Sequence, residues 1–156
     1  MDIVVQKATE LGVHRISPVI TDHSVVKLEP DRAAKRHAHW QKIAQSACEQ
    51  CGRNVLPAID TPQSLGNWFA DNAGTNRWQI ILRADAADAL PALDLPGNEV
   101  TLLIGPEGGF SEAEYESAAV AGLQAARLGP RIMRTETASL AALSIAQATW
   151  GDYRSA

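Results

Sequence analysis

The sequence predicts an α/β domain with a mostly parallel sheet and helices on both faces. Short apolar segments typical of buried strands alternate with segments of helical periodicity along the whole chain. Two of the strand-like segments run directly into glycine turns, at Gly105 and Gly129. A chain of 156 residues with 46% apolar residues is the size of one domain that can bury a core. We therefore treat residues 1–156 as one domain.

The first half of the chain predicts two helices and two strands. Apolar residues recur at helical spacing in residues 2–11, and Gly12 closes that helix. A long helix begins at Pro30, which suits the first helical position, and ends at Gly52. Its apolar stripe is Ala33, His37, Trp40, Ile43, Ala44 and Ala47. The two strands are predicted at residues 15–20 and 55–59.

The second half continues the alternation of helices and strands. A helix is predicted from Thr61 and Pro62 to about Phe69, followed by a buried strand at residues 78–82. Residues 84–99 carry four acidic residues, no basic residue and two prolines, which indicates a surface connection. The remaining predicted elements are a strand at 100–104, a helix opened by a Ser111/Glu114 capping box and closed by Gly122, a strand at 124–128 and a helix at 137–150.

The turn after the strand at 100–104 reads G-P-E-G-G-F and stands where α/β proteins bind ligands. It lacks the Lys-Ser/Thr of a phosphate loop and the G-x-G-x-x-G of a dinucleotide loop. Glu107 would repel a pyrophosphate but suits ribose hydroxyls or a cationic ligand. The turn therefore favours a nucleoside without phosphates, and the alternative is a tight βα turn with no ligand.

Two long motifs resemble a known family. G-P-E-G-G-F-S-x-x-E, followed by L-G-x-R-I-x-R-x-E-T-A from Leu128, is similar to the signature of the RsmE-type methyltransferases of the SPOUT superfamily. K-A-T-E-L-G-V from Lys7, W-Q-K-I-A from Trp40 and E-Q-x-x-R from Glu49 extend the resemblance over nearly the whole chain. Members usually carry a PUA-like N-terminal barrel of about seventy residues, and we expect this chain to be the catalytic part without that barrel.

The resemblance implies an enzyme that uses S-adenosylmethionine (SAM) to methylate N3 of a uridine in 16S rRNA of the small ribosomal subunit. It also implies a C-terminal trefoil knot that forms the SAM pocket, and a homodimer. Three alternatives stay open: a different SPOUT-type RNA methyltransferase, another enzyme with a nucleoside-like ligand, and a non-catalytic RNA-binding or dimerisation module.

Strand ends and glycine turns supply the candidate cofactor site. An adenosyl group needs an apolar slot with backbone donors and acceptors. The candidate cofactor-binding residues are Leu82, Ile104, Gly105, Glu107, Gly108, Leu128, Gly129, Ile132 and Met133. The three apolar strand residues in this set would be core in any α/β protein.

Methyl transfer to uracil N3 needs a group that stabilises the uracil anion or accepts its proton. Arg134 and Arg53 are the candidates for contact with uracil oxygens or the target phosphate, and Arg83 and Arg131 are secondary ones. An ion pair with Glu136 or Glu49 is the competing interpretation for these arginines. Glu107 and Glu136 are candidate proton acceptors, but a carboxyl with an ordinary pKa of about 4 is a weak base here. No residue is assigned as the base.

The net charge and the cysteine content limit which partners and metals the protein is expected to bind. The net charge of −4 argues against RNA binding, but residues 27–53 carry six Lys/Arg against three acidic residues. Lys35, Arg36 and Arg53 are therefore candidate RNA contacts, and a solvated helix face is the alternative. Cys48 and Cys51 have no second cysteine pair, so no metal is predicted. Without a run of about 20 apolar residues or a signal peptide, we expect a cytoplasmic protein and no membrane partner.

Overall fold

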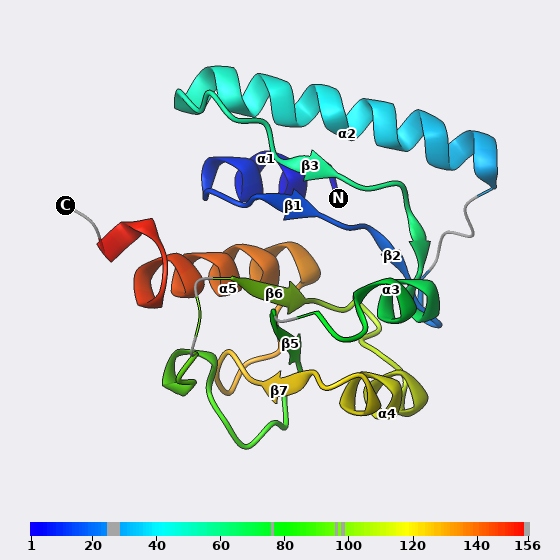
Figure 1. Cartoon of the computed structure of the whole chain (residues 1–156), viewed down its shortest axis with the longest axis vertical. Helices are drawn as coiled ribbons and strands as arrows, with labels where there is room; N and C mark the ends of the chain where they lie inside the picture. Colours follow the sequence, from blue (N-terminus) through cyan, green and yellow to red (C-terminus); the bar gives the residue numbers. More distant parts are fainter. Residues whose placement is uncertain (25–28, 76, 96, 98, 155–156) are drawn as a thin grey trace.

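A computed structural model describes residues 1–24, 29–75, 77–95, 97 and 99–154 of the chain. Figure 1 shows an upper layer built from the N-terminal half and a lower layer built from the C-terminal half. The upper layer contains α1 (Asp2–Glu10), β1 (Arg15–Ile16), β2 (Val19–Ile20), α2 (Pro30–Cys51), β3 (Ala58–Ile59) and β4 (Gln63–Ser64). The lower layer contains α3 (Leu65–Asn72), β5 (Trp78–Leu82), η1 (Leu90–Ala92), β6 (Val100–Leu103), α4 (Glu112–Val120), β7 (Gln124–Ala126), α5 (Thr135–Thr149) and η2 (Asp152–Arg154).

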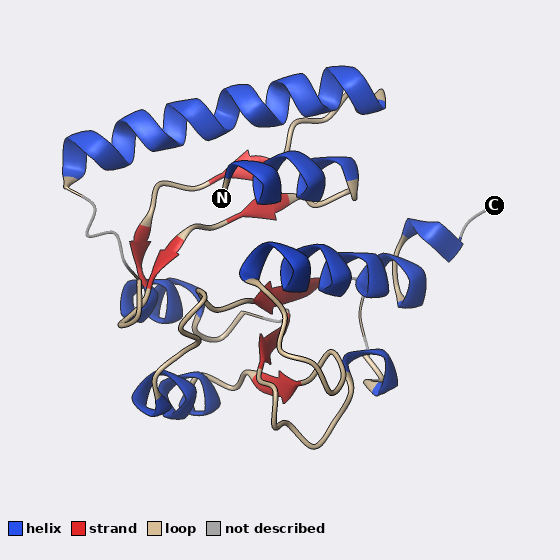
Figure 2. Cartoon of the chain, turned by 180° about the vertical axis from the view of Figure 1, so that it is seen from behind, coloured by secondary structure: helices blue, strands red, loops and turns tan. Residues whose placement is uncertain are grey.

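In the upper layer, two chain segments run side by side as an interrupted parallel ribbon. β1 pairs with β3 and β2 pairs with β4, all in parallel. α1 and α2 pack over this ribbon, as the view from behind also shows (Figure 2). A core of Val5, Trp40, Ala44 and Ile59 joins the two helices to the ribbon. Trp40 and Ala44 belong to the stripe predicted from the sequence, and both are buried.

The lower layer holds a three-stranded parallel sheet in the order β6-β5-β7. Side chains alternate across a strand, so neighbouring residues of central β5 face opposite sides. Ile80 packs with Ala142 of α5 and with Leu90, whereas Ile81 packs with Trp68 of α3 and Ala118 of α4. The predicted α/β class, with parallel strands and helices on both faces, is thereby confirmed.

Local start and stop signals in the sequence are also confirmed. Pro30 occupies the start of α2, and Gly52 ends that helix in a left-handed conformation with φ 77°. Ser111 accepts a hydrogen bond from the Glu114 amide, while the Glu114 carboxylate accepts one from the Ser111 amide. This pair is the complete capping box. Gly122 follows α4 with φ 86°.

Four sequence predictions need correction. The strand at 15–20 is two short strands, because Pro18 lies in the break between them and has no N–H to donate. The strand at 55–59 is only Ala58–Ile59, since Pro57 precedes it and Val55 is 65% exposed. The helix expected from Thr61 begins at Leu65 instead, after β4.

The fourth correction concerns residues 84–99, which are not merely a surface connection. Leu90 is fully buried in this segment, and Leu93 is 8% exposed. Both leucines pack in the core beneath α5. Composition alone indicated a surface loop because acidic residues and prolines surround these two leucines. Among the described residues, no helix is both long and apolar enough to cross a membrane.

Candidate functional site

A cavity of about 160 Å³ lies at the carboxyl ends of β5, β6 and β7. The ends of parallel strands on either side of a central strand are where open α/β sheets bind ligands. Eight of the nine sequence-predicted cofactor residues line the cavity: Leu82, Ile104, Gly105, Glu107, Leu128, Gly129, Ile132 and Met133. The ninth, Gly108, is not among the lining residues.

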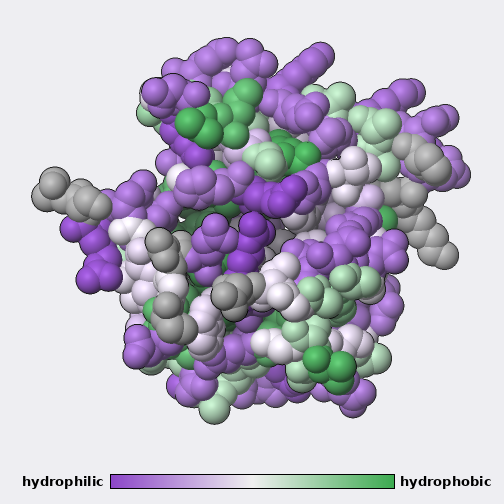
Figure 3. All heavy atoms as spheres, in the orientation of Figure 1, coloured by the Kyte–Doolittle hydropathy of each residue, from purple (hydrophilic) through white to green (hydrophobic). Residues whose placement is uncertain are grey.

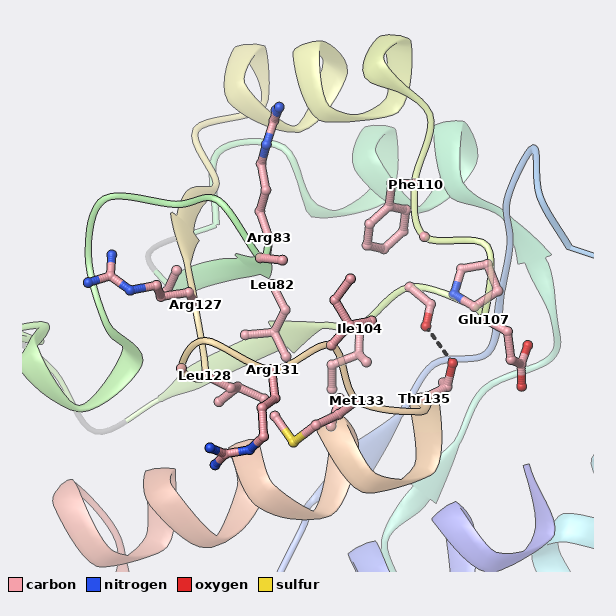
Figure 4. Close-up of a pocket in the computed structure, with 18 of the residues that line it drawn as sticks. Leu82, Arg83, Ile104, Glu107, Phe110, Arg127, Leu128, Arg131, Met133 and Thr135 are labelled. Carbon is pink, nitrogen blue, oxygen red and sulfur yellow. Dashed lines mark hydrogen bonds between the residues drawn. The ribbon is translucent and has the colours of Figure 1, made fainter.

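The first glycine loop, residues 105–110, forms one wall of the cavity (Figure 4). A Cβ atom at Gly105 would lie 3.2 Å from two ring carbons of Phe110, so this position has no room for a side chain without movement. The Phe110 ring in turn meets Tyr115 edge to face, with 5.6 Å between ring centroids. Thr135 Oγ1 donates to the Gly105 carbonyl at 3.0 Å and ties this loop to the start of α5.

The second glycine loop, residues 128–133, forms the opposite wall. Gly129 has φ 127°, a conformation that a residue with a side chain rarely adopts. Ile132 is 92% exposed at the mouth of the cavity, which is unusual for a large apolar side chain. Figure 4 shows Leu128 and Met133 beside Ile104 within the same hollow. The two loops therefore enclose an apolar space edged by backbone carbonyl and amide groups.

Arg83 and Tyr115 form a charged and aromatic cluster at the cavity. The Arg83 guanidinium carbon lies 4.4 Å from the Tyr115 ring centroid. Arg83 Nε donates to Asp85 at 2.7 Å, and Nη2 lies 3.3 Å from Glu112. Asp85, hydrogen bonded to Arg83, and then Glu112 raise the pKa of this guanidinium, and Arg83 lowers the pKa of Asp85. Arg83 is thus held by these partners, and in Figure 4 its side chain extends toward α4.

Tyr115 was not a candidate in the sequence. Burial raises the pKa of its hydroxyl, so the group stays protonated and donates to the Leu82 carbonyl at 3.4 Å. Phe110, Arg127 and Thr135 also line the cavity without having been predicted. Arg127 follows β7, and its guanidinium donates to the carbonyls of Ala86 and Ala87. The signals in the sequence that could have indicated Phe110 and Tyr115 are the place of Phe110 at the end of the first glycine loop and the place of Tyr115 in the helix that the loop opens.

Of the three candidate catalytic residues, Arg134 and Glu136 lie together at the start of α5, and Arg53 lies apart from them. Arg134 is the N-cap of α5, and Glu136 lies in the first turn of that helix. Both follow the second glycine loop, but neither lines the cavity. Among the described residues, no ion pair joins Arg134 to Glu136 or Arg53 to Glu49. The competing interpretation, in which these arginines form ion pairs with those two glutamates, is therefore wrong.

Arg53 lies elsewhere, with its guanidinium between α1 and the turn that follows it. Its Nη1 donates to the carbonyl of Thr9 at 2.6 Å and to that of Val13 at 3.0 Å. Arg53 follows Gly52, the residue that ends α2, and its side chain ties the two helix ends together. This contact is structural, and the predicted role of Arg53 at the reacting group stays a prediction.

The candidate RNA contacts Lys35 and Arg36 are exposed on α2. Figure 3 shows mainly hydrophilic side chains over this helix. The helix carries four basic residues, Arg32, Lys35, Arg36 and Lys42, against two acidic ones. Lys27, which contributed to the predicted basic stretch, lies outside the described residues.

A turn from the upper layer also contacts the first glycine loop. His23 Nδ1 lies 3.0 Å from the Gly108 carbonyl and 3.2 Å from that of Gly109. The Asp22 amide donates to Glu114 at 2.9 Å, and Ser111 Oγ donates to the Asp22 carboxylate at 2.7 Å. These partners are 85 to 92 residues apart in sequence. Periodicity and motifs gave no indication of this contact.

The two cysteines belong to α2 and its end. Cys48 is buried, and Cys51 is exposed with its thiol against the Cys48 carbonyl at 3.8 Å. Within the part of the chain that the structure describes, no group of three or more His, Cys, Asp or Glu side chains could hold a metal ion.

The cavity suits a ligand that has both an apolar part and polar groups. Its walls offer aliphatic side chains, and its two glycine loops offer backbone groups at close approach. The charged side chains among the lining residues are Glu107 and three arginines, Arg83, Arg127 and Arg131. Glu107 suits ribose hydroxyls or a cationic group placed beside it.

Comparison with known proteins adds a family and two ligand-bound structures. Residues 1–147 match the RNA methyltransferase domain family. The chain is 34% identical to the ribosomal RNA small subunit methyltransferase E of Buchnera aphidicola subsp. Acyrthosiphon pisum (strain APS) over 154 residues, 99% of this chain and 60% of that protein. It is 35% identical to the Bacillus subtilis (strain 168) protein of the same name, over 92% of this chain and 59% of the relative.

The fold resembles two solved structures that contain SAM. The ribosomal RNA small subunit methyltransferase E from Neisseria gonorrhoeae bound to S-adenosyl methionine aligns with a TM-score of 0.90 and 42% identity, covering 98% of this chain and 62% of that one. A Legionella pneumophila methyltransferase with bound SAM aligns with a TM-score of 0.89 and 39% identity, covering 95% and 60%. The chain thus spans about 60% of the length of the relatives that it matches.

Proposed function

This chain belongs to the RNA methyltransferase domain family, and we propose that it is the catalytic domain of an enzyme that transfers the methyl group of SAM to N3 of a uridine in 16S rRNA of the small ribosomal subunit. The observation that carries this proposal is the cavity between the two glycine loops, which holds eight of the nine predicted cofactor residues. Similar chains with SAM bound support the choice of ligand. Such a substrate would place the enzyme in the cytoplasm.

In the proposed reaction, uracil N3 attacks the methyl carbon in line with the bond to sulfur. The carbon–sulfur bond breaks, its electron pair stays on sulfur, and S-adenosylhomocysteine leaves as a neutral thioether. The N3 proton departs to a base. Because the sulfonium charge disappears during transfer, positioning contributes more to the rate than tight binding of that charge does. The two loops would fix the adenosyl group, with Glu107 near the cationic part of the ligand.

Arg134 and Glu136 remain the proposed groups for the uracil, because both directly follow the second glycine loop. Arg134 would stabilise negative charge on the uracil oxygens. Arg53 is the further candidate for contact with the uracil or the target phosphate, and its Nη1 also donates to two carbonyls around the end of α1. Lys35 and Arg36 on α2 are the proposed RNA contacts.

We also propose a knotted, dimeric arrangement. Arg127 in the segment after β7 exchanges backbone hydrogen bonds with Asp88 and Leu90 of the connection between β5 and β6, at 2.9 Å each. A chain segment that runs along this connection before α5 is consistent with a trefoil knot. The exposed Ile132 would be covered by a second copy or by the RNA substrate.

A calorimetric titration with SAM tests the proposal. Micromolar binding of SAM supports it, binding of another nucleotide such as ATP in its place favours a different nucleoside-dependent enzyme, and no binding of either favours a non-catalytic module. Methylation of isolated small subunits, read out as 3-methyluridine, then tests the reaction.

Gly129→Val should weaken SAM binding about ten- to a hundredfold while the protein stays folded. A β-branched residue at φ 127° is strained, and its side chain would stand at the cavity wall. Gly97→Val is the matched control, because Gly97 does not line the cavity and has no positive φ, and a Cβ there would meet no atom of the described residues within 4 Å. Unchanged SAM affinity in a folded Gly129→Val protein would contradict the assignment of the cavity.

A further inference from the structure

We infer that His23 is a positioning residue for the methyl donor, and that it acts through the Gly108 and Gly109 carbonyls of the first glycine loop. The inference rests on the proposed function for the identity of the ligand. It adds to the site a residue from the N-terminal half, outside both glycine motifs. It also explains Gly108, the predicted cofactor residue that does not line the cavity.

The contact fixes the protonation of one ring nitrogen. His23 Nδ1 lies 3.0 and 3.2 Å from two carbonyl oxygens, and carbonyl oxygens only accept hydrogen bonds. Nδ1 therefore carries a proton and donates to both carbonyls. This donor is present in the neutral ring and in the protonated ring, so the contact does not depend on the charge of the histidine.

Gly108 lies against the side chain of His23. A Cβ atom at this position would lie 3.1 Å from the Cβ of His23, closer than side chains ordinarily approach. Gly108 is not among the glycines with positive φ, unlike Gly109 with φ 69°. Clearance for His23, rather than an unusual backbone conformation, is therefore the reason for a glycine at 108.

The turn that carries His23 is itself fixed. Ser24 Oγ accepts from the Thr21 amide at 2.9 Å, and the Ser24 amide donates to the Thr21 carbonyl at 3.0 Å. The Asp22 amide and carboxylate are bound to Glu114 and Ser111 at the start of α4. Hydrogen bonds thus fix the turn that carries His23, and the imidazole can therefore fix the position of the first glycine loop.

Movement of these carbonyls would reach the ligand. Glu107 and Gly109, the neighbours of Gly108, line the cavity. Loss of the His23 hydrogen bonds would let the backbone of residues 107–109 move. The cavity lining would then be displaced, and its affinity for the ligand would fall. The upper layer, through one histidine, would then set the affinity of a cavity built by the lower layer.

The experiment measures SAM and S-adenosylhomocysteine affinity by calorimetry, together with the melting temperature, for variants of the full chain. His23→Leu removes the donor at similar size, and we expect about three- to tenfold weaker SAM binding, the effect of one lost hydrogen bond. In His23→Asn, the side-chain nitrogen stands as many bonds from Cα as Nδ1 does. That variant should recover affinity to within about twofold of the wild type. His14→Leu is the control, since His14 is an exposed histidine remote from this loop.

Gly108→Ala gives a second test of the same contact. The added methyl group should displace His23 and weaken SAM binding by a similar factor. The double variant with His23→Leu should lose less than the product of the two single effects, because both changes break one interaction. Multiplicative losses would show that the two positions act independently and would overturn the inference.

The remaining outcomes are also decisive. His23→Leu with wild-type affinity for SAM overturns the inference and leaves the proposed function intact. Failure of the wild-type chain to bind SAM overturns both. If His23→Leu and His23→Asn both keep wild-type SAM affinity but transfer the methyl group much more slowly, the ring acts as an acid or base rather than as a positioning group, since neither side chain can take a proton from uracil.

Discussion

Arg53 and Asp2 are single residues whose partners decide what they do. Arg53 looked like a catalytic arginine, yet both carbonyls that it binds belong to the region around the end of α1. Unpaired carbonyls at a helix end are costly when they are partly buried, and a guanidinium is a strong donor for them. The functional interpretation of an arginine therefore depends on which acceptors lie within its reach.

Arg53→Ala should lower the free energy of unfolding by about 1.5–3 kcal/mol, the usual cost of losing hydrogen bonds from a charged group. SAM affinity should not change. Urea denaturation and calorimetry measure the two quantities, with the exposed Arg32→Ala on α2 as control. Normal stability combined with loss of methyl transfer would instead mean that Arg53 acts at the reacting group.

Asp2 should make folding sensitive to acid. Its carboxylate accepts from His39 Nε2 at 2.9 Å and from Trp40 Nε1 at 3.0 Å, and the contact with His39 is the main cause that lowers the pKa of Asp2 below 3.8. A lowered folded-state pKa gives stability that is present above the unfolded pKa and lost as pH falls through the folded one. The loss between about pH 5 and pH 2 should stay below about 1 kcal/mol, because the side chain is largely exposed.

Urea unfolding across that pH range checks the Asp2 prediction. Asp2→Asn should reduce the loss of unfolding free energy as the pH falls. Asp71→Asn, on the exposed surface of α3, should leave that loss as in the wild type. If the Asp2 variant lost the same unfolding free energy at acidic pH as the wild type, the contact with His39 would not form in solution.

At the scale of elements, α2 combines two roles on opposite faces. One face packs Trp40 and Ala44 into the core, and the other presents basic side chains. Reversal of two charges, Lys35→Glu with Arg36→Glu, should weaken binding to 16S rRNA. The slope of the logarithm of the binding constant against the logarithm of the salt concentration should fall by about two, because about two phosphate contacts are lost. SAM affinity should be unaffected, because the helix does not line the cavity.

Filter binding at several salt concentrations measures this effect. The control is Glu49→Lys with Gln50→Lys near the other end of α2, which adds positive charge away from Lys35 and Arg36. An unchanged salt slope in the charge-reversal variant would show that the RNA meets another surface.

At the scale of the whole molecule, the proposed dimer predicts an apolar surface that a monomer would leave in water. Ile132 is 92% exposed, and Leu140 on α5 is half-buried. Leu140→Lys should shift the protein from dimer to monomer at micromolar concentration, measured by sedimentation velocity. Val120→Lys on α4, where the valine is 90% exposed, is the matched control. A wild-type monomer at these concentrations would contradict the dimer.

The sequence by itself determined the features that depend on near neighbours. Gly52 ends α2, Ser111 and Glu114 cap α4, and the glycine turns after β6 and β7 line the cavity. Each of these features depends only on residues that lie a few positions apart in the sequence. The tertiary structure decided the contacts between segments that are distant in the sequence. Arg53 meets Thr9 across 44 residues, and His23 meets Gly108 across 85. Local periodicity carries no information about such partners, since the packing of α1 against α2 and of the two layers is what brings them within hydrogen-bond distance.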